Sequence, residues 1–330
     1  MLRRELLHLG LAAPLVAGPL QRAPAQTLER RRAGILLTLH QTDPEGQARV
    51  AAVRMGLGRA GWREGVNIDI DYRWAPNDRD LLQRAAGELV AAKPDVIIAQ
   101  NTPATRAVLR LTTAIPVVFC QASDPVGSGL VASLARPGGN ATGFVDLEAS
   151  LATKWIELLK EIAPTLRRIA FLYNPATATY AEYYLGRFRA AAPGFGIEPV
   201  AAPVHDASEI ASVLAAHGRG GTGLIVMPEA SMGLYRAEIV EQAARHAVPA
   251  IYPYRYHTEG GGLVSYGIDL LDQYRRAGEY ASRILRGEKP ADLPVQQPTK
   301  FELTINLRTA RQLGLTVPPT MLVRADHVIE

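Results

Sequence analysis

The stretch PDVIIAQNTPATRAVLRLTTAIPVVFC, residues 94–120, contains two apolar runs separated by a segment with helical spacing. The apolar runs, residues 94–99 and 115–120, are short and continuous, as expected of strands buried on both faces of a sheet. Residues 104–111 between them fit a helix. A strand, a helix and a second strand in this order predict a right-handed βαβ unit, and therefore a parallel sheet covered by helices.

The same alternation continues on both sides of this unit. It predicts further strands at residues 33–39, 66–74, 168–173, 197–204, 223–227, 249–252 and 263–266. It predicts further helices at residues 45–60, 81–92, 148–162, 180–192, 237–246 and 270–285, and one capped by Asp206. A break at residues 136–143, which begins RPGGN, divides the strands into two similar halves. One large sheet is the alternative, but the break favours an α/β fold with two doubly wound parallel-sheet lobes.

The first 25 residues have the pattern of an export signal. Two arginines at positions 3 and 4 precede a mostly apolar stretch, residues 6–20, and Ala23 and Ala25 form a cleavage motif. A buried N-terminal helix is the alternative, which the prolines within the apolar stretch disfavour because they interrupt a helix. We therefore expect a signal peptide over residues 1–25 and a mature protein located in the periplasm.

The composition argues against several other classes of protein. Hydrophobic residues make up 48% and charged residues 21% of the 330 residues, which is ordinary for a globular protein. The formal net charge of +4 comes from scattered basic residues, so no nucleic-acid partner is expected. Cys120 is the single cysteine and cannot form an internal disulfide; its place at the end of an apolar run predicts a buried residue.

Sequence signals of catalysis and of metal binding are missing. The seven histidines have no metal-ligand spacing, and the sequence has no nucleophile elbow and no Walker loop. The glycine-rich segment at residues 218–223 precedes a predicted strand instead of following one, which is typical of a loop and not of a dinucleotide-binding turn. We therefore expect no catalytic residue, no metal and no cofactor.

Polar residues follow most of the predicted strands. In open α/β sheets, ligands bind beyond the carboxyl ends of the strands and next to helix N-termini, so these positions form the candidate site. Thr102 before Pro103 predicts a helix start, whose free N–H groups favour an anionic group by about 0.3–1 kcal/mol. The carboxylates of Asp124, Glu229 and Asp269 could accept hydrogen bonds from an ammonium or hydroxyl group. The candidate ligand-binding residues are Thr38, His40, Asn101, Thr102, Ser123, Asp124, Asn174, Glu229, Tyr254 and Asp269.

Each of these residues has a second interpretation. A polar residue after a strand can simply cap the following helix, and for any one position the two roles are equally well supported. His40 can equally face solvent. Tyr254, which clusters with Tyr252 and Tyr256, can pack at the edge of a lobe instead of stacking on a planar ligand. Several polar turns that line one cleft nevertheless favour a binding role for the set.

Five ordered motifs carry a resemblance to a known family. They are NTP at residues 101–103, SDPVGSGLVASLARPGGNATG at 123–143, KWIELLKEIAP at 154–164, SYGID at 265–269 and RILRGEKPADLPVQQPTKFELTINLRTARQLGL at 283–315. From about Ala33 to the C-terminus, the chain resembles ABC transporter substrate-binding proteins related to tryptophan- and tyrosine-uptake binding proteins. The resemblance implies a type I periplasmic-binding fold, in which about three crossovers join two lobes and a ligand lies in the cleft.

The resemblance also implies how the chain is divided. A proline-rich stretch, residues 290–298, precedes an apolar run at 301–307, and it suggests a last passage of the chain between the lobes. The expected lobe 1 comprises residues 26–145 and 269–295, and the expected lobe 2 comprises residues 146–268 and 296–330. The expected hinge lies near Val145-Asp146, Asp269 and Pro294. Closure at this hinge around a ligand would shift the protein toward its closed state.

The resemblance further implies a set of ligand contacts and partners. Carried over by position, the ligand would lie against Thr102, Ser123, Asp124, Asn174 and Asp269, with Glu229 and Tyr254 nearby. The loop after the first strand departs from the family pattern: it reads Thr38-Leu39-His40-Gln41, whereas the family often supplies serine or threonine there. The expected partners are a small-molecule solute, such as an amino acid, and the membrane permease of an ABC transporter. The protein itself is expected to be a monomer that binds without catalysis.

Two other functions fit the same pair of lobes. A ligand-sensing domain of a receptor or regulator would bind in the same cleft, but a transcriptional regulator needs a helix-turn-helix segment, for which the N-terminal leader leaves no room. An α/β enzyme such as a glycosyltransferase needs a nucleotide-phosphate loop or metal-binding carboxylates after a strand, and the sequence has neither. The sequence therefore favours an extracytoplasmic solute-binding protein of an ABC importer.

Overall fold

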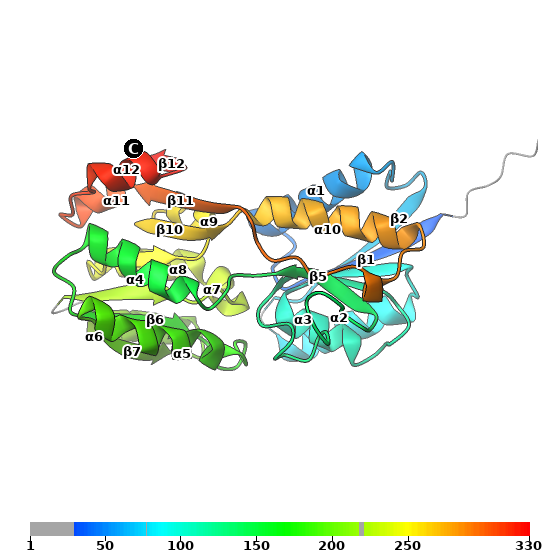
Figure 1. Ribbon diagram of the computed structural model, residues 1–330, viewed down its shortest axis with the longest axis horizontal. Coiled ribbons are helices and arrows are strands. Elements are labelled where there is room, and N and C mark those ends of the chain that lie inside the picture. The colour runs from blue at the N-terminus through cyan, green and yellow to red at the C-terminus, as the bar shows by residue number, and fades with distance from the viewer. Residues whose placement is uncertain (1–29, 77, 218–220) are drawn as a thin grey trace, which may run out of the picture.

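Two α/β lobes lie side by side in the computed structural model, which describes residues 30–76, 78–217 and 221–330 (Figure 1). The expected signal peptide, residues 1–25, lies outside the described residues. Each lobe has its own sheet, so the alternative of one large sheet is wrong. The expected fold class, two doubly wound and mostly parallel lobes, is confirmed.

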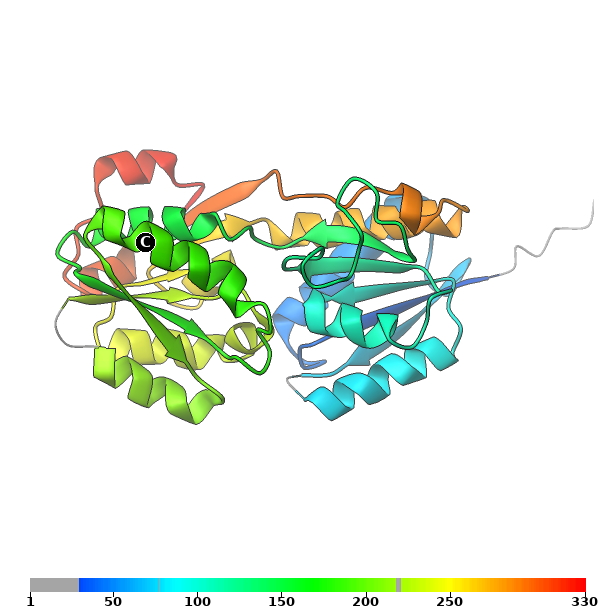
Figure 2. The same ribbon diagram turned by 60° about the horizontal axis from the view of Figure 1, so that its bottom comes forward.

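Lobe 1 is built on a five-stranded parallel sheet with the order β2-β1-β3-β4-β5. Its strands are β1 (Arg31–Leu37), β2 (Ile68–Trp74), β3 (Val96–Gln100), β4 (Val117–Ala122) and β5 (Ala141–Val145). One face is covered by α1 (Pro44–Arg59) and α10 (Leu270–Leu285), and the other by α2 (Arg79–Ala91) and α3 (Asn101–Leu109) (Figure 2). Ile35 and Leu37 pack in the core beneath α1 and α10, and Leu36 packs in the core beneath α2 and α3. Both faces of β1 are therefore buried, which explains its continuous apolar run.

Helix α10 comes late in the chain but packs on α1 in lobe 1. The two helices approach closely at two glycines. A Cβ atom on Gly56 would lie 1.9 Å from the carbonyl oxygen of Arg275, and one on Gly278 would lie 2.3 Å from that of Val53. Only residues without a side chain allow this separation, so the glycines set how deeply α10 sits on α1.

Lobe 2 is built on a seven-stranded sheet with the order β12-β11-β10-β9-β8-β6-β7, in which only the β10–β11 pair is antiparallel among the described strands. Its strands are β6 (Arg168–Tyr173), β7 (Glu198–Pro203), β8 (Thr222–Val226), β9 (Ala250–Tyr252), β10 (Val264–Ile268), β11 (Phe301–Asn306) and β12 (His327–Ile329). Its helices are α4 (Leu151–Ile162), α5 (Ala181–Ala191), α6 (Ala207–His217), α7 (Ala230–Leu234), α8 (Arg236–Arg245), α9 (Arg255–Glu259), α11 (Leu307–Gln312) and α12 (Pro319–Arg324).

Most predicted elements are present within a few residues of their expected bounds, and those that were missed, such as α7 and α9, are short. Strand β5 lies where the sequence suggested only a glycine-rich break. A Cβ atom on Gly143, within β5, would lie 2.1 Å from the carbonyl oxygen of Phe119 in β4, so this glycine permits a close approach of two strands. Cys120, also in β4, is fully buried, as expected.

The chain passes between the lobes at three places, after β5, after β10 and before β11 (Figure 1). Hydrogen bonds tie the three passages together. The backbone N–H of Val145 donates to Gln296 O at 2.9 Å, and Gln273 Nε2 at the start of α10 donates to Val145 O at 2.8 Å. The passages therefore form one compact strap along one side of the molecule instead of three independent linkers.

Candidate functional site

The carboxyl ends of the strands of the two lobes face each other and enclose a cavity, which we call the central cavity. Its cavity volume is about 20 Å³, which is room for about one water molecule, so a solute can enter only when the lobes or the lining side chains move apart. Lobe 1 supplies Leu39, Glu45, Arg49, Gln100, Asn101 and Gln121 to its lining, and the strap supplies Asp146. Lobe 2 supplies Tyr180, Pro228, Glu229, Ala230, Gly233, Arg236, Tyr254 and Tyr256.

A wider space, which we call the outer cleft, lies between the lobes on the side of α2 and α3. Its volume, measured in the same way, is about 500 Å³. Its lobe 1 wall carries Arg79, Arg106 and Arg110, and its lobe 2 wall carries the loop around Asn174 and Thr177. With Asp78 as the one carboxylate among the described residues that line this cleft, the three arginines give the entrance a net positive character.

The loops of lobe 1 are held rigidly at the cavity by their own side chains. Asn101 has a positive φ of 60° at the start of α3, and its Nδ2 donates to Thr38 Oγ1 at 2.7 Å. Thr102 is fully buried; its Oγ1 donates to Ser123 O at 3.1 Å and accepts from Ser123 N at 3.0 Å. These bonds join the loops after β1, β3 and β4 into one preformed wall.

Glu229 performs the same task in lobe 2. It lies between β8 and α7 and is 8% exposed. Its carboxylate accepts from Ser231 N at 2.7 Å, from Thr177 Oγ1 at 2.7 Å and from Asn174 N at 3.3 Å, which ties the loop after β6 to that after β8. Burial raises the pKa of Glu229 to about 7 even though these hydrogen bonds lower it.

Asp146 lies where the first passage of the chain leaves β5, and it is 3% exposed. Both of its carboxylate oxygens accept from the Tyr254 hydroxyl, at 2.7 and 2.8 Å. Burial raises the pKa of Asp146 to about 7, while the bonds from Tyr254 and from the Leu147 backbone lower it. The strap therefore carries an acid whose charge can change near neutral pH and whose partner belongs to lobe 2.

An ion pair closes the central cavity between the lobes. The guanidinium of Arg236, next to α7 at the start of α8, donates to both carboxylate oxygens of Asp43, the residue that caps α1, at 2.8 and 2.9 Å. Asp43 is 8% exposed, so the pair is partly shielded from water. The Arg236 guanidinium also lies 5.8 Å from the centre of the Tyr256 ring. This contact, which we call the interlobe clamp, can exist only while the lobes are close together.

Comparison with known proteins gives a family model that matches residues 42–329 and describes an ABC transporter substrate binding protein. The chain belongs to this family. A tyrosine-binding protein of Clostridioides difficile is 29% identical over 256 residues, which cover 77% of this chain and 73% of that relative. The expected family and the expected capture of a solute in a cleft are thus confirmed.

Two solved structures place this substrate-binding protein among relatives in different states. An ABC domain from Streptococcus pneumoniae in complex with L-Trp superposes with a TM-score of 0.85 at 26% identity, covering 91% of this chain and 100% of the relative. A ligand-free, open substrate-binding protein from Clostridium difficile superposes with a TM-score of 0.68 at 26% identity, covering 91% and 99%. Of these two structures, the complex superposes on this chain with the higher TM-score.

The substrate-binding protein brings five of the ten predicted site residues to the two interlobe spaces. Asn101, Glu229 and Tyr254 line the central cavity, and Thr38 and Asn174 line the outer cleft. Thr102 and Ser123 are fully buried behind this lining. The Ser123 hydroxyl lies 3.3 Å from that of Tyr184 in lobe 2, so the wall of lobe 1 also touches the other lobe.

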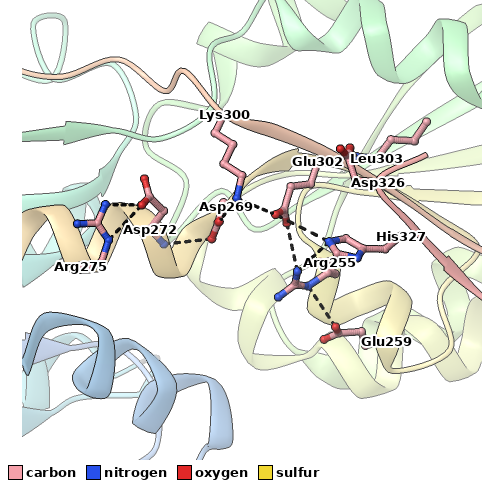
Figure 3. A network of polar contacts seen from close by, with 10 residues as sticks. All are labelled: Arg255, Glu259, Asp269, Asp272, Arg275, Lys300, Glu302, Leu303, Asp326 and His327. Carbon is pink, nitrogen blue, oxygen red and sulfur yellow. Dashed lines mark hydrogen bonds and ion pairs between the residues drawn. The ribbon is translucent and has the colours of Figure 1, made fainter. Parts of the chain in front are cut away.

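The other three predicted residues lie away from both spaces. His40 is exposed, and Asp124 accepts from Gly127 N at 2.9 Å within its own turn. Asp269 caps α10 and accepts from Lys300 Nζ at 2.7 Å, in a polar network that continues to Glu302 and Arg255 (Figure 3). Its surroundings are the strap and not the cavity, because the helix that it caps starts where the chain leaves lobe 2.

Sequence reasoning missed Arg49, Arg236 and Tyr256, and it gave Asp146 no role beyond the hinge. Arg49 lies on α1 between Gly46 and Val53 on the buried face, and this helical spacing was the one signal that could have revealed it. Within the described residues, no group of three or more His, Cys, Asp or Glu side chains could hold a metal ion. In the same part of the chain, no helix combines the length and the apolar character required to cross a membrane.

Proposed function

We propose that this substrate-binding protein captures its solute in the central cavity by closing its lobes, and that the closed form delivers the solute unchanged to a membrane permease. The observation that carries the proposal is the central cavity itself, which is lined by strand ends of both lobes and by the strap. We further propose that the protein is an exported, periplasmic monomer with a signal peptide over residues 1–25, and that it has no catalytic activity.

The described arrangement fits the closed state of this cycle. Its higher TM-score with the complex of L-Trp than with the open form supports this assignment, as does the interlobe clamp between Asp43 and Arg236. A solute that contacts both lobes only when they are close together shifts the population toward the closed form by its differential affinity. Binding and closure are then one thermodynamic event.

We assign the solute contacts to the residues at the two spaces. Asn101, Glu229 and Tyr254 would contact the solute in the central cavity, and Thr38 and Asn174 would line its path. Thr102 and Ser123 would hold the wall of lobe 1 in place from behind. A preformed wall raises affinity because less conformational freedom is lost on binding.

We propose that Asp269 acts at the hinge and not on the solute. Its carboxylate accepts from Asp272 N at 3.1 Å as the cap of α10 and from Lys300 on the third passage. This role is consistent with the proposed division of the chain into residues 26–145 with 269–295 and residues 146–268 with 296–330, because Asp269 lies where the second passage enters lobe 1.

Asp269→Ala is expected to lower the free energy of unfolding by about 1 kcal/mol, because α10 loses its cap, and to leave solute affinity within about threefold. Chemical unfolding and titration calorimetry with L-tyrosine and L-tryptophan measure the two effects. Asp78→Ala, which removes the cap of α2, is the matched control for stability. A loss of affinity of tenfold or more without a change in stability would move Asp269 into the binding site.

Asp146→Asn is expected to change how stability depends on pH. Since the folded pKa of Asp146 is raised to about 7, the folded state binds more protons than the unfolded state above pH about 4, and the wild type loses stability as pH rises through this window. Asparagine keeps an acceptor for Tyr254 but does not ionise. The wild type should therefore lose stability relative to the variant between pH about 4 and 7 and level off above it, as urea unfolding at each pH would show.

Other titrating groups cancel in this comparison because both proteins contain them. His257, for example, has its pKa lowered to about 3 by burial, and Glu229 has its pKa raised to about 7. Wild-type and variant curves that run parallel from pH 4 to 8 would mean that Asp146 stays ionised in the folded protein throughout this range.

The proposed function is tested by the state of a bound solute. Native mass spectrometry of freshly purified protein should reveal a small molecule that is released unchanged on denaturation, and prolonged incubation with that molecule should yield no product. Accumulation of a product would favour an enzyme, and this function would then be abandoned.

A further inference from the structure

Arg49 is a buried cation for which the described residues provide no counter-ion. Arg49 lies on α1, is 3% exposed and lines the central cavity. No carboxylate in the described part of the chain lies within ion-pair distance of its guanidinium, and its buried Nε has no hydrogen-bond partner. An unpaired charge removed from water is costly, so such a residue calls for an explanation.

Aromatic rings offset part of this cost. The guanidinium carbon of Arg49 lies 5.6 Å from the centre of the Tyr274 ring, on α10 of lobe 1, and 6.0 Å from that of Tyr256, on α9 of lobe 2. The cation therefore stands at the junction of the two lobes, where cation–π attraction holds it in position. Tyr274 also takes a side-chain hydrogen bond from Arg49. The guanidinium has five N–H donors, however, so others remain to bind an acceptor, and a π face does not replace a carboxylate.

The acids nearest to Arg49 are not arranged to neutralise it. Glu45, one turn earlier on α1, and Asp146 are close enough to feel its charge but lie beyond ion-pair distance. Both oxygens of Asp146 are occupied by the Tyr254 hydroxyl. Burial raises the pKa of Glu45, Asp146 and Glu229, so each favours its neutral form more than a carboxyl group in water does.

The other cation of the cavity is already paired. Arg236 gives both of its terminal nitrogens to Asp43 in the interlobe clamp. Apart from the three acids, the remaining polar lining consists of the amide side chains of Gln100, Asn101 and Gln121 and the hydroxyls of Tyr180, Tyr254 and Tyr256, which carry no charge. Helix α3 also begins at Asn101, and its first N–H groups favour an anion. The central cavity thus has one cation without an ion-pair partner, next to uncharged donors and to three carboxyl groups whose neutral form is favoured by burial.

We propose that Arg49 binds the carboxylate of the solute and so makes the central cavity selective for small organic acids, amino acids included, over their neutral analogues. The inference rests on the proposed function, since it says which residue of that same cavity binds the charged group of the solute. The planar fork of the guanidinium can donate two parallel hydrogen bonds to a carboxylate, which a lysine ammonium cannot reproduce. The bound anion would also neutralise the cation between the lobes, and this gain would favour the closed state.

A purely structural Arg49 is the competing interpretation, and it predicts different results. If Arg49 serves only to pack between Tyr256 and Tyr274, it would stabilise the solute-free protein. As an anion anchor, it is a cost that the solute-free protein bears for function. Arg49→Met, which keeps a long apolar side chain and removes the charge, should then leave the melting temperature of the solute-free protein unchanged or raise it.

The test measures binding by titration calorimetry with matched acids and amides: L-tyrosine and L-tyrosinamide, L-tryptophan and L-tryptophanamide, and L-leucine and L-leucinamide. The wild type should bind at least one acid about 10- to 100-fold more tightly than its amide, the range expected for hydrogen bonds to a charged group. Arg49→Met should lose this discrimination by weakening the acid alone, and Arg49→Lys should keep part of it. Arg54→Met is the matched control, because Arg54 lies on the same helix with a side chain that is 56% exposed.

The outcomes separate the two proposals. Equal affinity of the wild type for acid and amide, or full discrimination in Arg49→Met, would overturn the role of Arg49 while leaving the proposed function intact. A lower melting temperature of solute-free Arg49→Met, together with retained discrimination between acid and amide, would show that Arg49 has a purely structural role. A wild type that binds none of these probes and no solute from its own purification would contradict the proposed function itself.

Discussion

Gly56→Ala is expected to lower the free energy of unfolding by about 3 kcal/mol. The added methyl group would lie 1.9 Å from the carbonyl oxygen of Arg275, so α1 and α10 must separate. Overpacking of a well-filled contact typically costs about 1–3 kcal/mol, and here the obstacle is backbone, which cannot rotate away as a side chain can. Since α10 joins the late part of the chain to lobe 1, its displacement should also loosen the strap. Urea unfolding followed by circular dichroism measures the loss.

Gly58→Ala is the matched control for this prediction. It lies two residues later on the same helix, and nothing is within 4 Å of the position that its Cβ would take. Alanine is the better helix former, so this variant should gain about 0.5–1 kcal/mol. Equal effects of the two substitutions would show that the close contact between α1 and α10 does not determine the stability of lobe 1.

Arg236→Met is expected to weaken solute binding by about 5- to 100-fold and to open the solute-free protein. The substitution removes the interlobe clamp and leaves the largely buried carboxylate of Asp43 without its partner, which costs free energy only in the closed state. Titration calorimetry with L-tyrosine and L-tryptophan, together with the radius of gyration from solution scattering, measures both effects.

Arg245→Met is the matched control on the same helix. Arg245 pairs with Glu241 within α8, and both side chains are 61% exposed, so an effect on binding is not expected. An Arg236→Met protein that binds as tightly as Arg245→Met would mean that the clamp contributes nothing to closure.

The sequence predicted the parallel sheets because buried strands have an unmistakable pattern. Strands such as β1 and β3 are apolar at successive positions, since their side chains enter cores on both faces. Several other short elements carry no such pattern. Helices α7 and α9 have five residues each, and β5 contains Gly143, a residue type that is unfavourable in strands. Their existence depends on tertiary contacts that the local sequence does not contain.

The candidate site was predicted in part, for a reason of geometry. Polar residues after strands, such as Asn101 and Glu229, could be placed at a cleft because the ends of parallel strands must meet at one edge. Arg49 and Arg236 could not, because both lie on helices, where an isolated arginine is usually a solvent-facing residue. They line the central cavity only when the two lobes come together, and neither helical periodicity nor turn chemistry reveals this from the sequence.

Asp269 is a predicted site residue that the structure places outside the central cavity and the outer cleft. It follows a strand and precedes a helix, as the residues at the cavity do, and it belongs to a motif, SYGID, that resembles a family pattern. Strand β10, however, leads the chain out of lobe 2 through the strap, so the residue at its carboxyl end contacts Lys300 of the strap. The same turn chemistry thus serves two purposes, and only the path of the chain separates them.

The central claim, that the two lobes close on a solute, can be tested directly by the distance between α2 and α6. Arg84 on lobe 1 and Ser212 on lobe 2 are both exposed. In the double variant Arg84→Cys, Ser212→Cys, the two new thiols can carry a donor and an acceptor dye, while the native Cys120 is buried. We predict that energy transfer rises in a saturable way as the solute recovered from the purified protein, or L-tyrosine or L-tryptophan, is added to protein that has been stripped and refolded. Energy transfer that stays constant while calorimetry reports binding would contradict closure.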